Sequence, residues 1–295
     1  MPTSQSYPNL RELWDFSSPA QTRDKFQSLL ETLNLENNHP YRLEIITQIT
    51  RTYSLEAKFD LGHRLLNENL SYIDISTPLV KTRYHLERGR LYNSNNEFAE
   101  ALEQFYRAFD LAKSNQLHYL AVDAAHMIAI AEQNREISVN WNIKAIEYAE
   151  QSNDSEAHKW LGYLYNNLGW SYHDQEKFDL ALAMFEKARD FHEENGNVKS
   201  LAIAKWTVGR AYRSLGQIED ALMIMHQLED AAIQEDKPVD GYVFEELAEL
   251  YLMLGDHKKS GHYFAEAYTI LSQDIWLKRN EPDRLNRMKR LSDLN

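Results

Sequence analysis

Eleven histidines and several adjacent carboxylates are the residues of this sequence whose chemistry could support catalysis or metal binding. A zinc-binding helix needs two histidines four residues apart, so that both lie on one face. His192 opens the segment HEEN without a second histidine at that distance, and His257 and His262 lie five residues apart near a turn. Adjacent carboxylates such as Glu193 and Glu194 are common in any acidic helical protein. We therefore expect no metal site, no cofactor and no catalytic centre.

The composition excludes several other classes of site. The chain has no cysteine, which rules out a disulfide framework, a Cys-ligated zinc and a thiol nucleophile. It has no glycine-rich phosphate loop, no G-x-S-x-G turn and no kinase motif set. The net charge of −13 argues against general binding of nucleic acid or of an anionic membrane. We see neither a signal peptide nor an apolar run of about 18 residues, so we expect a cytoplasmic protein with no membrane partner.

Helices are the elements that would position any functional residue in this chain. Only 10 glycines and 7 prolines occur among 295 residues, and no proline lies between Pro78 and Pro238. Alanine, leucine, glutamate, glutamine and lysine dominate, often at i, i+3 and i+4 spacing, which is typical of amphipathic helices. Strand-like alternation of β-branched residues is scarce. The sequence therefore predicts an all-α fold.

A set of small and large residues recurs at fixed spacing along these helices. Between residues 163 and 188 the set is Leu168, Gly169, Tyr172, Ala181, Phe185 and Ala188. The equivalent tyrosines recur with a period of about 40 residues, at Tyr53, Tyr92, Tyr172, Tyr212 and Tyr251. Two helices approach to about 8–10 Å only where their side chains are small, and a glycine inside a helix costs about 1 kcal/mol relative to alanine. We therefore expect close helix crossings at Gly89, Gly169, Gly209 and Ala248.

This pattern resembles the tetratricopeptide repeat family. The resemblance rests on a Leu-Gly-x-x-Tyr core in a first helix and an Ala-x3-Phe-x2-Ala core in a second, and it covers residues 43–271. The family's period is about 34 residues, so the longer period implies longer helices or loops. Arg88 stands where the family has leucine, and the copy around Ala125 lacks the tyrosine. The resemblance implies a right-handed superhelical solenoid of stacked antiparallel helix pairs, which share one continuous core.

The resemblance also implies a domain organisation. We place six helix pairs at about 43–70, 82–113, 118–151, 158–194, 200–235 and 241–271. A helical cap in residues 1–42 and a basic capping helix in residues 272–295 would close the stack. The basic residues of the last segment could contact nucleic acid or an acidic partner, favour the end of their helix, or fold back onto the acidic body.

In this family the first helix of each pair lines the concave surface, so equivalent positions on these helices form rows. The position after the small residue is occupied by Arg51, Arg90, His126, Trp170, Arg210 and Glu249. Asn166 and Trp206 lie one turn earlier, and Asn93 and Arg213 follow their core tyrosines. An acidic chain thus concentrates arginine, asparagine and tryptophan on one expected face.

These residue types suit a peptide ligand. Arginine binds carboxylates through two N–H groups, asparagine pairs with backbone N–H and C=O, and tryptophan gives a large anchor at low entropic cost. We predict a groove for a peptide with acidic groups or a free carboxylate. Its predicted peptide-binding residues are Arg51, Arg90, Asn93, His126, Asn166, Trp170, Trp206, Arg210 and Arg213.

Other interpretations of the same rows stay open. The arginines could be solvated or paired with nearby acids, and the tryptophans could pack between repeats. Only Asn166 and Arg210 match the family's carboxylate clamp for chaperone C-termini, so that specificity is not carried over. The long repeats also resemble the sensor domains of bacterial peptide-pheromone receptors, whose output domain would not fit before Leu43. The sequence thus predicts a non-catalytic peptide-binding scaffold, with a regulatory peptide sensor lacking a DNA-binding domain, or a self-assembling homo-oligomer, as alternatives.

Overall fold

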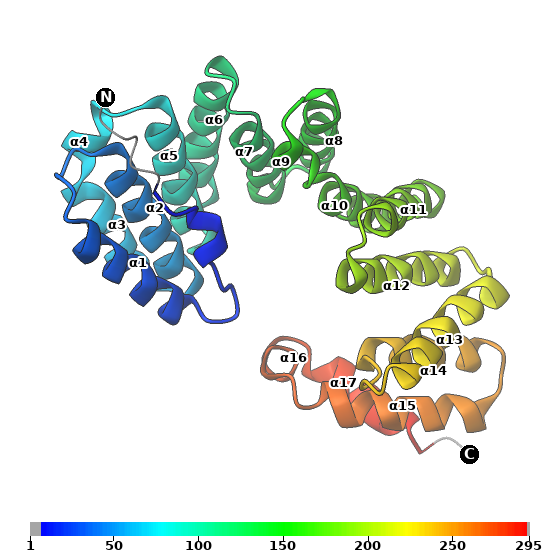
Figure 1. Cartoon of the computed structure of the whole chain (residues 1–295). Helices are drawn as coiled ribbons and strands as arrows, with labels where there is room; N and C mark the ends of the chain where they lie inside the picture. Colours follow the sequence, from blue (N-terminus) through cyan, green and yellow to red (C-terminus); the bar gives the residue numbers. More distant parts are fainter. Residues whose placement is uncertain (1–6, 294–295) are drawn as a thin grey trace. The chain divides into compact units, whose positions relative to one another are not determined.

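The computed structural model describes residues 7–293, and every regular element in that range is a helix (Figure 1). The prediction of an all-α fold is therefore confirmed. The helices form two compact units, Met1–Leu161 and Gly162–Asn295, which we call unit 1 and unit 2 and describe separately.

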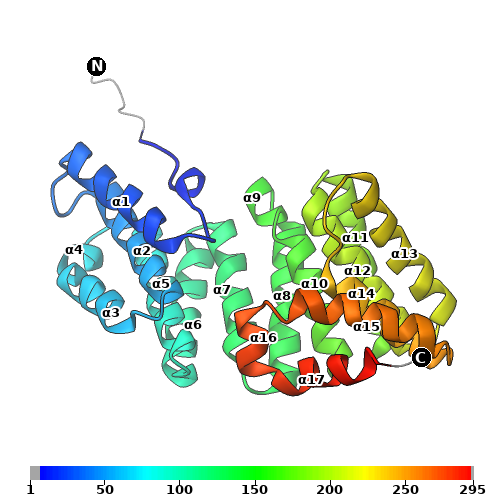
Figure 2. The same ribbon diagram turned by 90° about the horizontal axis from the view of Figure 1, so that it is seen from below.

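Unit 1 is a stack of antiparallel helix pairs with a short segment before it. Its elements are η1 (Leu10–Leu13), α1 (Pro19–Leu33), α2 (Pro40–Leu55), α3 (Phe59–Glu68), α4 (Leu70–Asp74), α5 (Pro78–Ser94), α6 (Phe98–Ser114), α7 (His118–Ala131), α8 (Arg135–Gln151) and α9 (Ser155–His158). Helix α2 pairs with α3, α5 with α6 and α7 with α8, and the pairs join through contacts of α2 with α5 and of α6 with α7. Figure 2 shows these helices from a second direction.

Unit 2 continues the same pattern. Its elements are α10 (Leu161–His173), α11 (Phe178–Glu194), α12 (Val198–Ser214), α13 (Ile218–Gln234), α14 (Gly241–Met253), α15 (His257–Leu271), α16 (Ile275–Asn280) and α17 (Pro282–Leu291). Helices α12 and α13 pair, as do α14 and α15, and α12 also touches α11 and α14. The family-like helices α5, α6, α11, α12 and α13 each have 17 residues, and these long helices account for the long repeat period.

The helix boundaries follow from proline and from left-handed turn residues. Pro40 and Pro78 lie in the first turns of α2 and α5, where a missing N–H leaves no helical bond unmade. The turns after α12 and α14 contain Gly216 and Gly255 with φ of +75° and +76°. Glycine adopts this conformation without strain and lets the chain reverse into the next helix.

The helices of each pair cross at the small residues that the sequence predicts. A Cβ atom added to Gly169 would lie 2.5 Å from Cε1 of Phe185, and one added to Gly89 would lie under 3.0 Å from the ring of Phe105. At Ala248 the backbone oxygen accepts a hydrogen bond of 3.0 Å from the Ser260 hydroxyl of the paired helix. The glycines therefore leave room for an aromatic ring of the partner helix.

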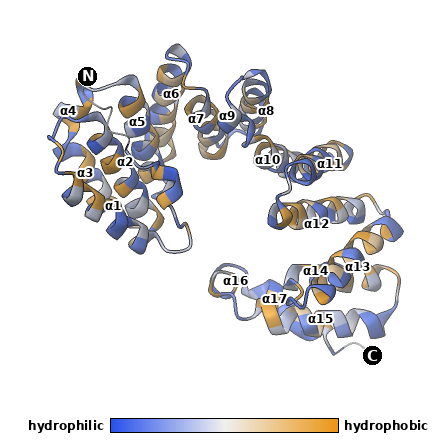
Figure 3. Cartoon of the chain, viewed as in Figure 1, coloured by the Kyte–Doolittle hydropathy of each residue, from blue (hydrophilic) through white to orange (hydrophobic). Residues whose placement is uncertain are grey.

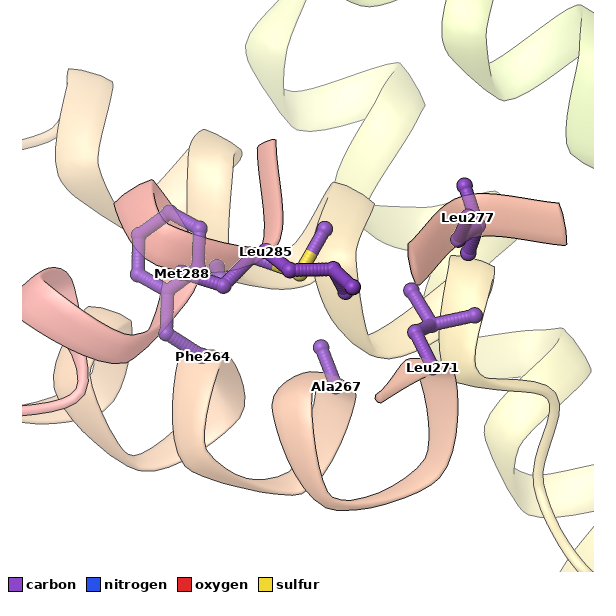
Figure 4. Packing of buried hydrophobic residues seen from close by; sticks show 7 residues of the cluster. Phe264, Ala267, Leu271, Leu277, Leu285 and Met288 are labelled. Atoms are coloured by element: carbon purple, nitrogen blue, oxygen red, sulfur yellow. The ribbon is translucent and has the colours of Figure 1, made fainter. Parts of the chain in front are cut away.

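The C-terminal segment closes unit 2 with two helices instead of the single helix expected. Helix α16 ends at Asn280, and Pro282 begins α17. Leu277, Leu285 and Met288 from α16 and α17 pack onto the exposed side of α15 and bury its apolar residues (Figure 4). Packing of this kind covers the apolar face that a helix pair of a repeat protein would otherwise expose.

Hydrophobic and polar residues alternate along the helices, as Figure 3 shows. No helix in the described part of the chain is both long enough and apolar enough to cross a bilayer. The apolar positions instead pack between helices, with Phe26, Phe105, Phe185 and Phe264 among the fully buried side chains.

Candidate functional site

In unit 1, the predicted arginines of α2 and α5 lie next to carboxylates of the neighbouring helices. Arg90 is buried and donates hydrogen bonds of 2.6 Å to Glu87 and 2.5 Å to Asp123 on α7. Arg51 lies with its Nη1 3.8 Å from Oε1 of Glu87 and has a 26% exposed side chain. The cationic groups that the sequence assigns to a ligand thus already have anionic partners.

Burial and charge act against each other in this cluster. Burial would raise the pKa of Asp123, but the positive charges of Arg90 and Arg51 hold it below its usual value. Burial and the charge of Arg90 lower the pKa of Arg51. Burial also lowers the pKa of His126, one turn after Asp123, to about 4, so this imidazole is neutral at pH 7. The cluster has two cations and two anions when Glu87 is included, and it carries no excess charge for an acidic ligand.

Unit 2 contains the same arrangement. Arg213 of α12 binds Glu246 of α14 through two N–H groups, at 2.5 and 3.0 Å. Nε of Arg210 lies 3.3 Å from the same carboxylate. Burial opposes the charge on Arg213, yet its hydrogen bonds to Glu246 raise its pKa above the usual value.

The capping helix α17 extends the arrangement on the other side of α14. Arg284 donates two hydrogen bonds, of 2.7 and 2.6 Å, to Glu245, and Arg287 binds Glu249. The basic C-terminal segment therefore folds back onto acidic residues of its own unit, one of the alternatives considered from the sequence.

These contacts form a regular series, which we call the inter-repeat charge pairs. An arginine just after the small residue of one repeat contacts an acid two positions before the small residue of the next repeat. The members are Arg51–Glu87, Arg90–Asp123 and Arg210–Glu246. The sequence analysis identified the arginines but not their acidic partners. It compared residues at the same position of every repeat, whereas each ion pair joins two different positions of successive repeats.

The predicted asparagines have unused hydrogen-bonding capacity. The side-chain oxygens of Asn93 on α5 and Asn166 on α10 are buried and accept no hydrogen bond from the residues that the structure describes. A buried polar atom without a partner is costly, and a ligand N–H would satisfy either oxygen. Each asparagine lies in a different unit, so we treat the two as separate positions.

The two predicted tryptophans lie side by side in unit 2. The rings of Trp170 and Trp206 have centroids 6.1 Å apart, and Trp170 also meets the edge of Phe185 at 5.2 Å. Trp206 donates its ring N–H to the backbone oxygen of Tyr242 at 3.1 Å. Trp170 joins α10 to α12, and Trp206 joins α12 to α14, so both have a packing role between repeats.

Trp206 also lines a pocket of about 840 Å³ between α12, the end of α13 and the start of α14. The lining is mainly apolar and comprises Val198, Lys199, Ala202, Ile203, Trp206, Leu228, Ala231, Ala232, Glu235, Lys237, Pro238, Asp240, Tyr242 and Val243. This volume lies in the range of ligand pockets, which are about 300–1,000 Å³. Sequence reasoning named only Trp206 of this set. The i, i+4, i+8 spacing of Val198, Ala202 and Trp206 was the available signal for one apolar face of α12.

The charged groups around the pocket differ in whether they have partners. Lys237 pairs with Glu235 at 2.6 Å, and Asp240 accepts a hydrogen bond from the backbone N–H of Tyr242 at 2.9 Å. Lys199 is exposed and makes no ion pair within residues 7–293. Among the described residues that line the pocket, Lys199 is therefore a cation without an ion-pair partner, beside an apolar cavity.

Groups of acids and histidines that could hold a metal ion do not occur among the described residues. Several histidines serve as hydrogen-bonding partners instead. For example, His226 contacts the Tyr251 hydroxyl at 2.9 Å, and His173 contacts the Ser214 hydroxyl at 2.9 Å.

Comparisons with known proteins agree with this architecture. The Tetratricopeptide repeat family model matches residues 161–195, which include α10 and α11. No curated protein matches the sequence. The fold is similar to that of the apo form of RapI, with a TM-score of 0.72 at 11% identity over 94% of this chain and 83% of that chain.

Two further structures have the same fold. One is a signal-transduction ATPase with a tetratricopeptide repeat sensor from Pyrococcus horikoshii, with a TM-score of 0.70 at 15% identity over 91% of this chain but only 42% of that one. The other is NprR in complex with its cognate peptide NprX, with a TM-score of 0.53 at 15% identity over 96% of this chain and 81% of that one. The family match of residues 161–195, together with the fold shared with these structures, confirms the prediction of tetratricopeptide-type repeats.

Proposed function

We propose that this chain is a non-catalytic scaffold that binds a peptide segment of a partner protein, and that the pocket of unit 2 holds an apolar side chain of that segment. The pocket beside Trp206 is the observation that carries this proposal. The likeness to NprR, which was solved with its cognate peptide, supports the same class of ligand.

The chemistry of the pocket selects the kind of segment. Its apolar lining favours a leucine, methionine or aromatic side chain, since burying one such group contributes about 1.5–3 kcal/mol. Val198 and Ile203 are 67% and 53% exposed, and a ligand would remove both from water. Lys199 lies at the rim and makes no ion pair within residues 7–293, so a carboxylate next to the buried side chain would pair with it. A peptide that ends in an apolar residue has both groups.

The predicted row residues take different parts in this proposal. For Asn93 and Asn166, contact with a peptide backbone stays a prediction: their side-chain oxygens accept no hydrogen bond within the described chain, and the side chains would have to turn for a ligand N–H to reach them. For Arg51, Arg90, Arg210 and Arg213, binding an acidic ligand stays a prediction. A ligand carboxylate at these sites would have to replace an internal carboxylate, so its net gain would be small.

The experiment is a selection from a random peptide library followed by affinity measurements on single variants. Enriched peptides should carry an apolar residue at or near their C-terminus. Ile203→Glu places a charge at the pocket and should weaken them at least tenfold. Ile233→Glu is the matched control, because Ile233 is 62% exposed on α13 and outside the lining.

A second variant tests the polar half of the site. Lys199→Ala should weaken a peptide with a free C-terminal carboxylate severalfold and leave its C-terminal amide unchanged. If the library yields no enriched peptide, or if Ile203→Glu and Ile233→Glu bind the enriched peptides equally well, the proposal is wrong.

A further inference from the structure

The segment before α1 contacts the first helices of more than one repeat of unit 1. We call the residues that it contacts there the inner face of unit 1; they are Gln48, Arg51, Tyr119 and Glu156. Leu10 is 6% exposed and packs with Phe26 and Ile45 of α1 and α2. Trp14 donates its ring N–H to Oε1 of Gln48 on α2 at 2.9 Å. These contacts anchor the segment at the first repeat.

The anchor uses a position that belongs to the inter-repeat charge pairs. Gln48 occupies in its repeat the place of Glu87 and Asp123, the acids that receive an arginine from the preceding repeat. Within the described residues no helix pair before α2 supplies that arginine, and Trp14 donates the hydrogen bond instead. The N-terminal segment therefore contacts the same row of positions as the inter-repeat charge pairs.

Arg11 reaches much further than a terminal cap requires. Its guanidinium lies 3.7 Å from the ring centroid of Tyr119 on α7, and its Nη1 donates a hydrogen bond of 2.7 Å to Glu156 on α9. A cap needs to cover only the first helix pair, whereas these partners belong to the third pair and the helix after it. The contacts have the form of ligand recognition: a cation on an aromatic ring, with a carboxylate beside it.

A second cation–aromatic contact has the opposite arrangement. Arg51 of α2 lies 5.8 Å from the ring centroid of Trp14 and 5.4 Å from that of Phe16. The two rings of the segment stack at 4.8 Å, and Phe16 is 60% exposed. Aromatic groups of the segment thus meet an arginine of the face, and the arginine of the segment meets an aromatic group of the face.

The contacts of Arg11 are partly exposed to solvent, unlike the buried contact of Leu10. The side chains of Arg11 and Glu156 are 36% and 38% exposed, and Glu156 also pairs with Lys159 at 2.5 Å, so it keeps a partner when Arg11 departs. Ion pairs this exposed are weak. Water can replace the contacts of Arg11 because both charged groups are partly exposed. Loss of the Arg90 contacts would instead leave buried charges without a partner.

We propose that residues Leu10–Phe16 are a reversible internal ligand of unit 1, and that the inner face they cover binds a partner segment of the same chemistry. That segment has an arginine followed three residues later by a tryptophan. The face recognises the arginine through Tyr119 and Glu156 and the tryptophan through Gln48 and Arg51. This inference concerns unit 1 and does not depend on the pocket of unit 2.

The test uses a fluorescent synthetic peptide with the sequence of residues 7–18, added to the full chain and followed by anisotropy. The wild-type chain should bind it weakly, with no saturation near 100 μM, because a tethered copy has an effective concentration in the millimolar range. The variant Arg11→Ala/Trp14→Ala, which weakens the internal copy, should bind the peptide at least tenfold more tightly. Arg107→Ala removes an exposed ion pair elsewhere in unit 1 and should bind like wild type.

Two further measurements separate recognition from a general loosening of the unit. In the Arg11→Ala/Trp14→Ala background, Glu156→Gln should weaken the peptide about fivefold, and a peptide with alanine in place of its arginine should bind about fivefold less well. If the double variant loses helicity by circular dichroism, Arg11→Ala alone replaces it, since Leu10 and Trp14 then keep their packing. Equal peptide binding by the wild-type and Arg11-lacking chains, or no effect of Glu156→Gln, would overturn the proposal.

Discussion

Replacement of Gly169 by alanine tests whether small residues set the distance between paired helices. The new Cβ atom would lie 2.5 and 2.6 Å from two ring carbons of Phe185, whose side chain is fully buried. A buried ring has no free end that can turn away, so helix α10 or α11 would have to move. Gly209 offers a matched comparison, because its added Cβ meets the terminal methyl of Met225, which is flexible, and then Ile224 at 3.3 Å.

The expected magnitudes come from two opposing effects. Alanine is better than glycine inside a helix by about 1 kcal/mol. Overpacking a well-filled core costs about 1–3 kcal/mol, and a rigid neighbour places the cost in the upper part of that range. Gly169→Ala should therefore lower the free energy of unfolding by about 1–2 kcal/mol. Gly209→Ala should leave it unchanged or raise it by up to about 1 kcal/mol, because the methionine can adjust.

Thermal unfolding followed by circular dichroism at 222 nm gives the readout. At about 4 °C per kcal/mol for a unit of this size, Gly169→Ala should lower Tm by about 4–8 °C, while Gly209→Ala should change it by about 0 to +4 °C. Phe185→Leu removes the ring that the new methyl group would meet. In the Phe185→Leu background, Gly169→Ala should therefore lower Tm by less than it does in the wild-type chain. Equal stabilisation by both alanines would refute the packing argument, since propensity would then be the only effect.

Two predictions concern the buried charges of unit 1. Arg90→Ala leaves Glu87 and Asp123 without their cation and should lower the free energy of unfolding by about 3–5 kcal/mol in urea titrations, whereas Arg107→Ala, at an exposed pair, should cost less than about 1 kcal/mol; similar losses would contradict the role of burial. Burial lowers the pKa of His126 to about 4, and an unfolded histidine titrates near 6.5, so the unfolded chain takes up the proton first. The stability due to neutral His126 is complete above about pH 6.5 and is lost, by roughly 2–3 kcal/mol, as the pH falls to 4. Urea midpoints of His126→Gln should accordingly depend less on pH in this window, and an unchanged pH dependence would count against the burial.

The fold could be predicted because its determinants are local and repeated. A glycine followed three residues later by a tyrosine, and an alanine four residues before a phenylalanine, occur in several copies, and each copy reports the same crossing of two helices. Gly169 and Phe185 are close in sequence, and their contact needs only one turn between two helices. The break of the C-terminal cap at Pro282 was also visible in the sequence, since proline begins helices far more readily than it continues them.

The candidate site was less predictable because its contacts join different repeats. An arginine such as Arg90 looks available for a ligand when only its own row is considered. Asp123 lies 33 residues away, and the pair becomes visible only when two positions of successive repeats are compared. The same comparison finds Arg51 with Glu87, so the signal was present in the sequence as a recurring spacing.

The inter-repeat charge pairs change which residues of such a surface are candidates for ligand contacts. A charged side chain that recurs in register with an opposite charge one repeat later stabilises the stack, and its charge already has a partner within the protein. Residues that lack such a partner are more informative. Gln48 stands in the series but receives its hydrogen bond from Trp14, and Lys199, which lies outside the series, makes no ion pair within the described residues. Lys199 borders the pocket of unit 2 and Gln48 receives the N-terminal segment, so each marks a place in the described chain where recognition chemistry is not used by the repeats themselves.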